Sequence, residues 1–164
     1  MDFDFSEDQI DLSNLAKTIF SDLSTSDRVA QIEKTDQRFD KNLWEALSDS
    51  GLLGITLPES YGGLGLGMVE LSLVLEQLGR RVAPVPLFAT SILGSWAIAK
   101  FGKSDQKEYW LRDVCAGNQI LTGAWTPQTN LKNLIAENDG NKWRITGEKP
   151  VSYTHLTLPT SDLV

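Results

Sequence analysis

Residues capable of chemistry are few and widely spaced in this sequence. Its 164 residues include a single cysteine, Cys115, and a single histidine, His155. No group of cysteine, histidine and carboxylate side chains has the spacing of a metal site, so we expect no metal ligands. Cys115 follows Val114 on an expected helix, which favours a buried apolar role over that of a nucleophile. The residue types alone therefore predict no catalytic residue.

The strongest local signal is the segment from Gly51 to Gly67, which reads GLLGITLPESYGGLGLG. Glycines at this density mark backbone that needs positive φ or close approach by a neighbour. Pro58 disfavours helix immediately before it, so we expect a shaped, non-helical loop. The glycines lack the G-x-G-x-x-G spacing of a dinucleotide site. Glu59 could act as a base, but a carboxylate in such a turn more often accepts backbone N–H groups.

Helices are predicted on both sides of this loop. Ser6 and Gln9 have the form of a capping box, before an apolar stripe that runs to Leu23. Residues 26–39 suggest a short helix and a loop. Asp40 is a suitable N-cap for a helix that ends at Gly51 as its C′ residue.

After the loop, a helix is expected from Met68, stopped by Gly79, with Arg80 and Arg81 complementing the helix dipole. The next helix begins at Pro84 and Pro86 and is apolar on more than one side up to Phe101. This pattern predicts a helix that is buried between others or lines an apolar cavity. A last helix is expected from a Ser104 cap to Gly117.

The pattern changes after the last helix. Residues 120–125 suggest a strand, and residues 134–138 and 142–146 flank Asp139-Gly140, a strong β-hairpin signal. We therefore predict a mainly α fold, with a helical domain over residues 1–118. The first strands of a β domain would occupy residues 119–150.

Composition narrows the possible partners and the compartment. The formal net charge of −7 is spread along the chain, which argues against nucleic acid or a membrane as partner. A lone cysteine excludes an internal disulfide and fits a reducing compartment. The N-terminus has no signal-peptide pattern, and the apolar stretch from Pro86 to Phe101 is too short to span a bilayer. We expect a cytoplasmic protein.

The glycine-rich loop and five further segments occur in an order that resembles the acyl-CoA dehydrogenase family. The loop pattern is G-L-L-G-I-x-x-P-E-x-Y-G-G-L-G. The other segments are FSEDQ (residues 5–9), WEAL (44–47), LEQLGR (75–80), FGKSDQK (101–107) and ITGEK (145–149). The resemblance implies an N-terminal helical bundle followed by the start of the family's middle β domain.

The family's chemistry is the α,β-desaturation of acyl-CoA thioesters with FAD. A carboxylate base removes the α-proton while a hydride leaves the β-carbon for the flavin. In relatives the base is a glutamate in a C-terminal helical domain that this chain lacks. The resemblance further implies an acyl-CoA substrate, an acceptor of the electron-transfer flavoprotein type, and a homo- or hetero-oligomer.

The resemblance also suggests individual site residues. Thr126 falls on a threonine that contacts the flavin in relatives, with Trp125 beside it, although Gly123 replaces an aromatic residue and a glutamate is missing. Thr126 could instead be a turn hydroxyl. The helix after Pro86 corresponds to one that lines the acyl pocket, which suggests Phe88 and Ser91 as wall residues; core packing is the alternative for both.

Residues 151–164 depart from the family pattern. The segment VSYTHLTLPT resembles translated sequencing-adaptor read-through, although a native strand is the rival interpretation. His155 lies there, so we assign it no catalytic role.

Three functions fit the sequence. The first is a fragment of an acyl-CoA dehydrogenase, inactive alone. The second is a degenerate, flavin-poor structural subunit of a heteromeric dehydrogenase, which the altered segment from Gly123 to Asn130 supports. The third is a helical interaction module without cofactor.

Overall fold

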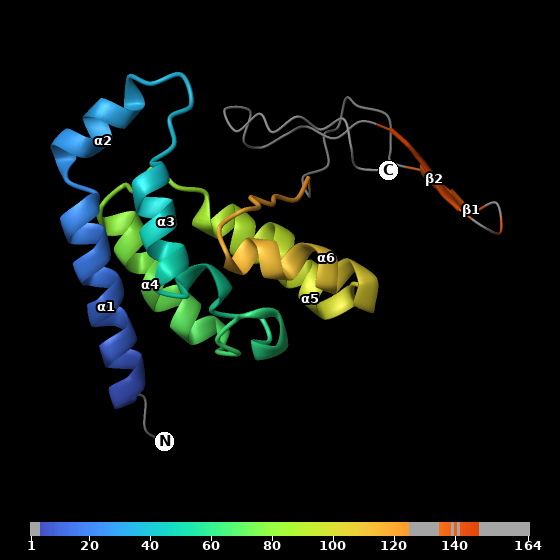
Figure 1. Ribbon diagram of the computed structural model, residues 1–164, viewed down its shortest axis with the longest axis horizontal. Coiled ribbons are helices and arrows are strands. Elements are labelled where there is room, and N and C mark those ends of the chain that lie inside the picture. Colours follow the sequence, from blue (N-terminus) through green and yellow to red (C-terminus); the bar gives the residue numbers. More distant parts are fainter. Residues whose placement is uncertain (1–3, 125–134, 139, 141, 148–164) are drawn as a thin grey trace. The chain divides into compact units, whose positions relative to one another are not determined.

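The computed structural model describes residues 4–124, 135–138, 140 and 142–147. The chain divides into two compact units, residues 1–122 and residues 123–164. The described part of the first unit is helical, and that of the second contains a β-hairpin (Figure 1). The predicted mainly α fold is therefore confirmed.

The helices of the first unit are joined by short connections and by two turns of 3₁₀-helix. In chain order the elements are α1 (Glu7–Leu23), α2 (Ser26–Glu33), α3 (Lys41–Asp49), the 3₁₀-helices η1 (Leu52–Gly54) and η2 (Glu59–Tyr61), α4 (Met68–Arg80), the π-helix η3 (Ala89–Ser95), α5 (Trp96–Phe101) and α6 (Ser104–Cys115).

Two predicted helix caps are confirmed. The backbone N–H of Gln9 donates to Ser6 Oγ at 3.2 Å, while the Ser6 N–H donates to Gln9 Oε1 at 3.0 Å, which completes the capping box of α1. At α3, the Leu43 N–H donates to Asp40 Oδ1 at 3.3 Å. Gly51 follows that helix with φ of 75°, as expected of a C′ glycine.

Two other helix ends differ from the prediction. The N-cap of α6 is Lys103 rather than Ser104, because the Gln106 side chain accepts the Lys103 N–H at 3.0 Å. Gly79 does not end α4, which continues through Arg80. The chain reverses at Val82, with φ of 50°, where the Ala83 N–H donates to the Leu78 carbonyl at 3.2 Å. That hydrogen bond satisfies one of the terminal carbonyls of α4, which ends one residue after the glycine.

The glycine-rich loop is shaped as predicted, although it contains η1 and η2 and is therefore not wholly non-helical. Gly62 and Gly65 have φ of 87° and 65°. A Cβ at Gly63 would overlap the Leu57 carbonyl, so only glycine fits there. The Leu64 N–H donates to the Gly54 carbonyl at 2.9 Å, and the Leu66 N–H to that of Ile55 at 2.8 Å. These bonds fold the loop back on itself.

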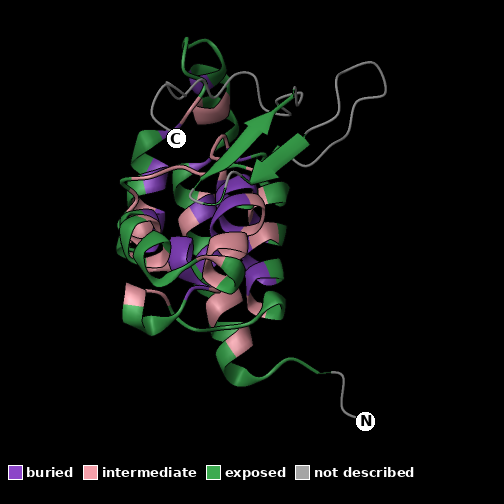
Figure 2. Cartoon of the chain, turned by 90° about the vertical axis from the view of Figure 1, so that its right-hand side faces the viewer, coloured by how far each residue is buried: buried purple, intermediate pink, exposed green. Residues whose placement is uncertain are grey.

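Most buried apolar side chains form one cluster between the helices. Figure 2 shows all buried residues in purple. The members of the cluster come from α1, α3, η1, α4 and the chain leading to η3: Ala16, Phe20, Leu43, Trp44, Leu47, Leu52, Leu53, Ile55, Leu71, Val74, Ala83 and Leu87. A second cluster joins Leu57 of the loop to Leu111 and Val114 of α6. The loop is thus part of the core, as its leucines suggested.

Polar contacts tie distant parts of the first unit together. Trp44 Nε1 donates to the Gly117 carbonyl at 2.9 Å, and Ser48 Oγ to the Cys115 carbonyl at 3.1 Å. Both bonds fasten α3 to the end of α6. Since the partners are more than 60 residues apart along the chain, these bonds fix tertiary rather than local structure.

The predicted β-hairpin is present. Strands β1 (Ile135–Asn138) and β2 (Trp143–Thr146) pair antiparallel, with Asn138 opposite Trp143. Gly140 in the turn has φ of 94°. The strand predicted from Ile120 is absent over residues 120–124, because Ile120 and Leu121 pack on the two helical clusters instead. Among the residues that the structure describes, no helix is long and apolar enough to cross a membrane.

Candidate functional site

Three hydroxyl side chains are buried together in η3. Thr90 and Ser95 are fully buried and Ser91 is 3% exposed. Ser95 Oγ donates to the Thr90 carbonyl at 2.8 Å and lies 3.3 Å from the Ser91 carbonyl. Thr90 Oγ1 and Ser91 Oγ have no hydrogen-bond partner in the described part of the protein. A buried hydroxyl without a partner costs about 1–3 kcal/mol, so a pair of them needs an explanation.

The π-helical geometry explains part of this arrangement. The Trp96 N–H donates to the Ser91 carbonyl, five residues back, which defines the wide turn. In this register the Thr90 and Ser91 carbonyls can accept further hydrogen bonds, and the Ser95 hydroxyl reaches both of them. Single π turns inside α-helices are frequent at functional sites. The two unpartnered hydroxyls make η3 the best candidate site among the described residues.

Phe88 and Ser91, predicted as wall residues of an acyl pocket, lie in different environments. Phe88 immediately precedes η3 and is 44% exposed, whereas Ser91 is buried. An exposed ring remains available to a ligand or to another part of a longer protein. A buried hydroxyl instead requires a polar partner. Their assignment to an acyl pocket remains a prediction.

A close packing contact fixes the position of η3. A Cβ at Gly94 would overlap the Leu121 side chain, so the glycine allows the chain after α6 to lie directly on the π-helix. Leu121 packs in the second cluster, beside Ile98 of α5. Residues that precede α6 in the sequence and residues that follow it therefore pack together at η3.

Sequence reasoning missed Thr90 and the π turn. The available signal is the group of three hydroxyl residues in ATSILGS, of which the sequence analysis singles out Ser91 alone. Because the following residues are ordinary helix formers, nothing in the local pattern distinguishes i→i+5 from i→i+4 hydrogen bonding.

The predicted flavin residues, Trp125 and Thr126, lie outside the described residues, as do residues 151–164 with His155. The assignment of Trp125 and Thr126 to the flavin site remains a prediction. No group of three or more potential metal ligands occurs among the described residues.

Cys115 and Glu59 are the two other residues that the sequence analysis considered as reactive groups. Cys115 is partly buried against Gly54, where an added Cβ would come 2.7 Å from the cysteine Sγ. Burial raises the pKa of its thiol, which makes it less reactive. Glu59 is exposed on η2, with its carboxylate near Gly65.

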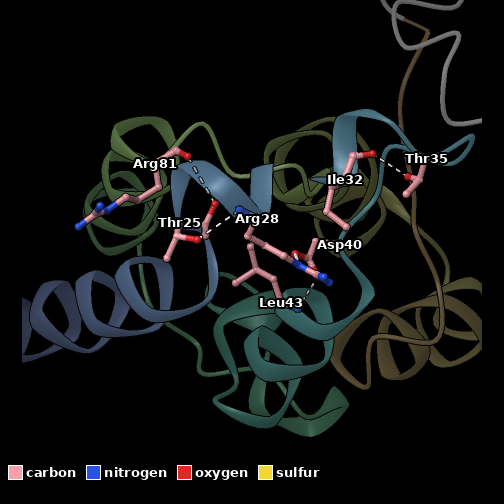
Figure 3. A network of polar contacts seen from close by, with 8 residues as sticks. Thr25, Arg28, Ile32, Thr35, Asp40, Leu43 and Arg81 are labelled. Atoms are coloured by element: carbon pink, nitrogen blue, oxygen red, sulfur yellow. Dashed lines mark hydrogen bonds and ion pairs between the residues drawn. The ribbon is translucent and has the colours of Figure 1, made fainter. Parts of the chain in front are cut away.

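The most strongly held carboxylate in the described part is Asp40. Arg28 Nε and Nη2 donate to its two oxygens at 2.7 and 2.9 Å, and Asp40 is 1% exposed (Figure 3). The hydrogen bonds from Arg28 lower the pKa of Asp40, so the carboxylate stays ionised. It joins α2 to the start of α3, and both of its oxygens already accept hydrogen bonds. Its role is structural.

The chain belongs to the acyl-CoA dehydrogenase family. Residues 6–118, which include α1 to α6, match the family's N-terminal domain. The acyl-CoA dehydrogenase FadE27 of Mycobacterium tuberculosis is 35% identical over 149 residues, a match that covers 91% of this chain and 40% of that protein.

Solved structures give the same family. A chain of the ChsE4–ChsE5 complex from Mycobacterium tuberculosis superposes with a TM-score of 0.82 at 35% identity, over 90% of this chain and 40% of that one. An acyl-CoA dehydrogenase complexed with FAD from Bacillus anthracis matches with a TM-score of 0.65 at 26% identity, over 71% of this chain and 20% of that one. The chain spans about 40% of the length of its first curated relative.

Proposed function

We propose that this chain is the N-terminal part of a longer FAD-dependent acyl-CoA dehydrogenase that desaturates an acyl-CoA thioester between the α- and β-carbons. The observation that carries the proposal is the family match over residues 6–118, together with the helical architecture of the same residues. The similarity to an acyl-CoA dehydrogenase complexed with FAD supports this choice of cofactor.

Within that enzyme, η3 and the residue before it contribute to the wall around the acyl group. Phe88 offers an exposed ring, and the Ser91 and Thr90 hydroxyls offer polar atoms that need partners. Since a purely aliphatic chain cannot satisfy a hydroxyl, these groups are suited to a polar atom of the substrate or of a neighbouring segment. Trp125 and Thr126 contact the flavin, which supplies the hydride acceptor when bound.

The proposed domain division places the helical domain at residues 1–118, the start of a β domain at residues 119–150, and a non-native tail at residues 151–164. The division of the chain into units at residues 122 and 123 is compatible with this boundary. The catalytic base comes from a domain beyond this sequence. The partners are an acyl-CoA, an electron-transfer flavoprotein-type acceptor and further subunits.

The chain alone is inactive in this proposal. It lacks the proton acceptor and most of the flavin's contacts, and each of these is worth orders of magnitude in rate or affinity. Visible absorbance tests this directly. The purified 164-residue protein should be colourless, and a version extended with its own downstream sequence should carry one flavin per site. A yellow 164-residue protein would mean that the flavin site is misplaced.

The alternative is a structural, flavin-poor subunit of a heteromeric dehydrogenase. It is favoured by the similarity to a chain of the ChsE4–ChsE5 complex and by the changed residues at Gly123 to Asn130. A colourless extended protein that copurifies with a flavin-bearing partner would support this alternative. A colourless extended protein without a partner would favour a helical module and contradict both.

A further inference from the structure

Helices α1 and α4 lie side by side in the first unit and are bonded to each other at both ends (Figure 1). At their first turns, Gln9 Nε2 donates to Glu70 Oε1 at 2.7 Å. At their other ends, Arg81 Nη2 donates to Ser21 Oγ at 2.8 Å. The two helices therefore run in the same direction, and their N-termini meet.

Gln9 and Glu70 occupy the same position in their helices, the third residue after the N-cap. Gln9 Oε1 accepts the N–H of the N-cap Ser6 at 3.0 Å. Glu70 Oε2 accepts the N–H of the N-cap Gly67 at 2.9 Å. Each side chain thus bonds its own helix with one terminal atom and the neighbouring helix with the other. Ser6, Gln9, Glu70 and Gly67 form one continuous series of hydrogen bonds, which we call the joined caps.

The donors and acceptors of the joined caps fit together in one direction only. The Ser6 N–H needs an acceptor, so the Gln9 side chain turns its oxygen to Ser6 and its amide N–H groups to Glu70. Glu70 must then accept from both Gln9 and Gly67, which two carboxylate oxygens can do and a single amide oxygen cannot. The bond from Gln9 lowers the pKa of Glu70, so its carboxylate is ionised at neutral pH.

The joined caps lie at the exit of the glycine-rich loop. Gly67 is the last residue of that loop, and the Leu66 N–H just before it donates to the Ile55 carbonyl at 2.8 Å. An added Cβ at Gly67 would come 2.9 Å from Glu70 Oε2, so the glycine lets the carboxylate lie close to the backbone. A side chain of α4 therefore holds the loop exit and is itself held by the first turn of α1.

We propose that the joined caps make the first turns of α1 and α4 one cooperative unit, so that the exit of the glycine-rich loop opens only together with the start of α1. A hydrogen bond to a carboxylate, such as the one from Gln9 to Glu70, is about twice as strong as a neutral one. Helix ends without such a link fray independently, with opening free energies near zero. This conformational coupling does not depend on the proposed function.

An exchange of the two side chains tests the proposal, because it reverses the direction of the link and keeps every hydrogen bond. In Gln9→Glu two carboxylates meet, and in Glu70→Gln one amide oxygen must serve both Gln9 and Gly67. In the double variant Gln9→Glu/Glu70→Gln, the carboxylate accepts from Ser6 and from the new amide, whose oxygen accepts from Gly67. The double variant also keeps the net charge of the protein.

Hydrogen exchange of the Gly67 amide is followed by NMR in the 164-residue protein at pH 6. We expect each single variant to speed this exchange by about fivefold or more, and the double variant to return it to within about twofold of the wild-type rate. Gln106→Glu is the matched control. Gln106 caps Lys103 on α6 in the same way, but among the described residues its cap is not joined to another, so Gly67 exchange should not change.

Circular dichroism verifies that each variant is helical. Unchanged Gly67 exchange in Gln9→Glu would overturn the proposal, because α1 would then have no effect on the loop exit. Exchange in the double variant as fast as in the single variants would overturn it too, since the link would not be what those variants lost. Equal acceleration by Gln106→Glu would indicate a general loss of stability and would also contradict the coupling.

Discussion

At the scale of single residues, Asp40 combines two roles that the sequence revealed only in part. Its position before α3 predicted an N-cap, which the bond from the Leu43 N–H confirms. The ion pair with Arg28 was not predictable, because the partner lies on a different helix and 12 residues away along the chain. Helix caps follow local rules, whereas the choice of an ion-pair partner depends on tertiary packing.

The substitution Asp40→Asn keeps a good N-cap residue and removes the ion pair. We expect a loss of about 2 kcal/mol in the free energy of unfolding. This is less than for a fully buried pair because the Arg28 side chain is 35% exposed. Asp40→Ala, which also removes the cap, should cost about 1 kcal/mol more. Urea denaturation measures both, and equal stability of Asp40→Asn and the wild-type protein would contradict the structural role.

The same residue predicts a dependence of stability on pH. The pKa of Asp40 is lowered in the folded protein, chiefly by the Arg28 hydrogen bonds. Its contribution is therefore complete above the ordinary aspartate pKa of about 4 and is lost as the pH falls through the lowered pKa. The stability difference between the wild-type protein and Asp40→Asn should shrink from pH 6 to pH 2. A difference that stays constant over this range would contradict the assignment.

Substitutions of Gly63 and Glu59 test whether the glycine-rich loop has a structural or a chemical role. Gly63→Val should cost more than about 3 kcal/mol, because its Cβ would overlap the Leu57 carbonyl. Glu59→Gln, at an exposed position, should change stability by less than about 0.5 kcal/mol. Thermal melting of the two variants tests this order. A larger loss for Glu59→Gln would give the carboxylate a role that the structure does not show.

At the scale of elements, η3 is where sequence and structure diverge most. The apolar pattern from Leu87 to Phe101 predicted a buried helix. The buried side chains of Ala89, Thr90 and Ser91 agree with that, whereas α5 contains no buried residue. The pattern did not indicate the π register, because that register depends on which carbonyl each backbone N–H reaches and not on the apolar spacing. Likewise, the apolar residues after Gly117 suggested a strand but serve as packing for the helices.

Thr90→Val should reveal whether the unpartnered hydroxyl is a cost to the isolated chain. Valine has nearly the same shape and removes an unsatisfied buried group, so the 164-residue protein should be unchanged or stabilised by up to about 1 kcal/mol. Ser95→Ala is the matched control: its hydroxyl is bonded, and its loss should destabilise by about 1 kcal/mol. If both variants lose stability equally, Thr90 has a structural partner and η3 is an ordinary core segment.

At the scale of the molecule, the helical unit should fold without the remainder of the chain. Its two apolar clusters and the α3–α6 bonds all lie within residues 1–122. A chain ending at Thr122 should therefore show a mainly helical circular dichroism spectrum. We expect a broad melting transition, because faces such as Phe101, 76% exposed, remain uncovered. A spectrum of β structure or random coil would contradict the fold.

Acyl-CoA reduction of bound flavin is the most direct test of the central claim, that these residues are the N-terminal part of an acyl-CoA dehydrogenase. The extended protein is titrated anaerobically with a panel of acyl-CoA thioesters while the visible flavin absorbance is recorded. The account predicts stoichiometric bleaching by at least one thioester, and no flavin absorbance from the 164-residue protein. A yellow extended protein that no acyl-CoA bleaches, or bleaching by the 164-residue chain alone, would contradict it.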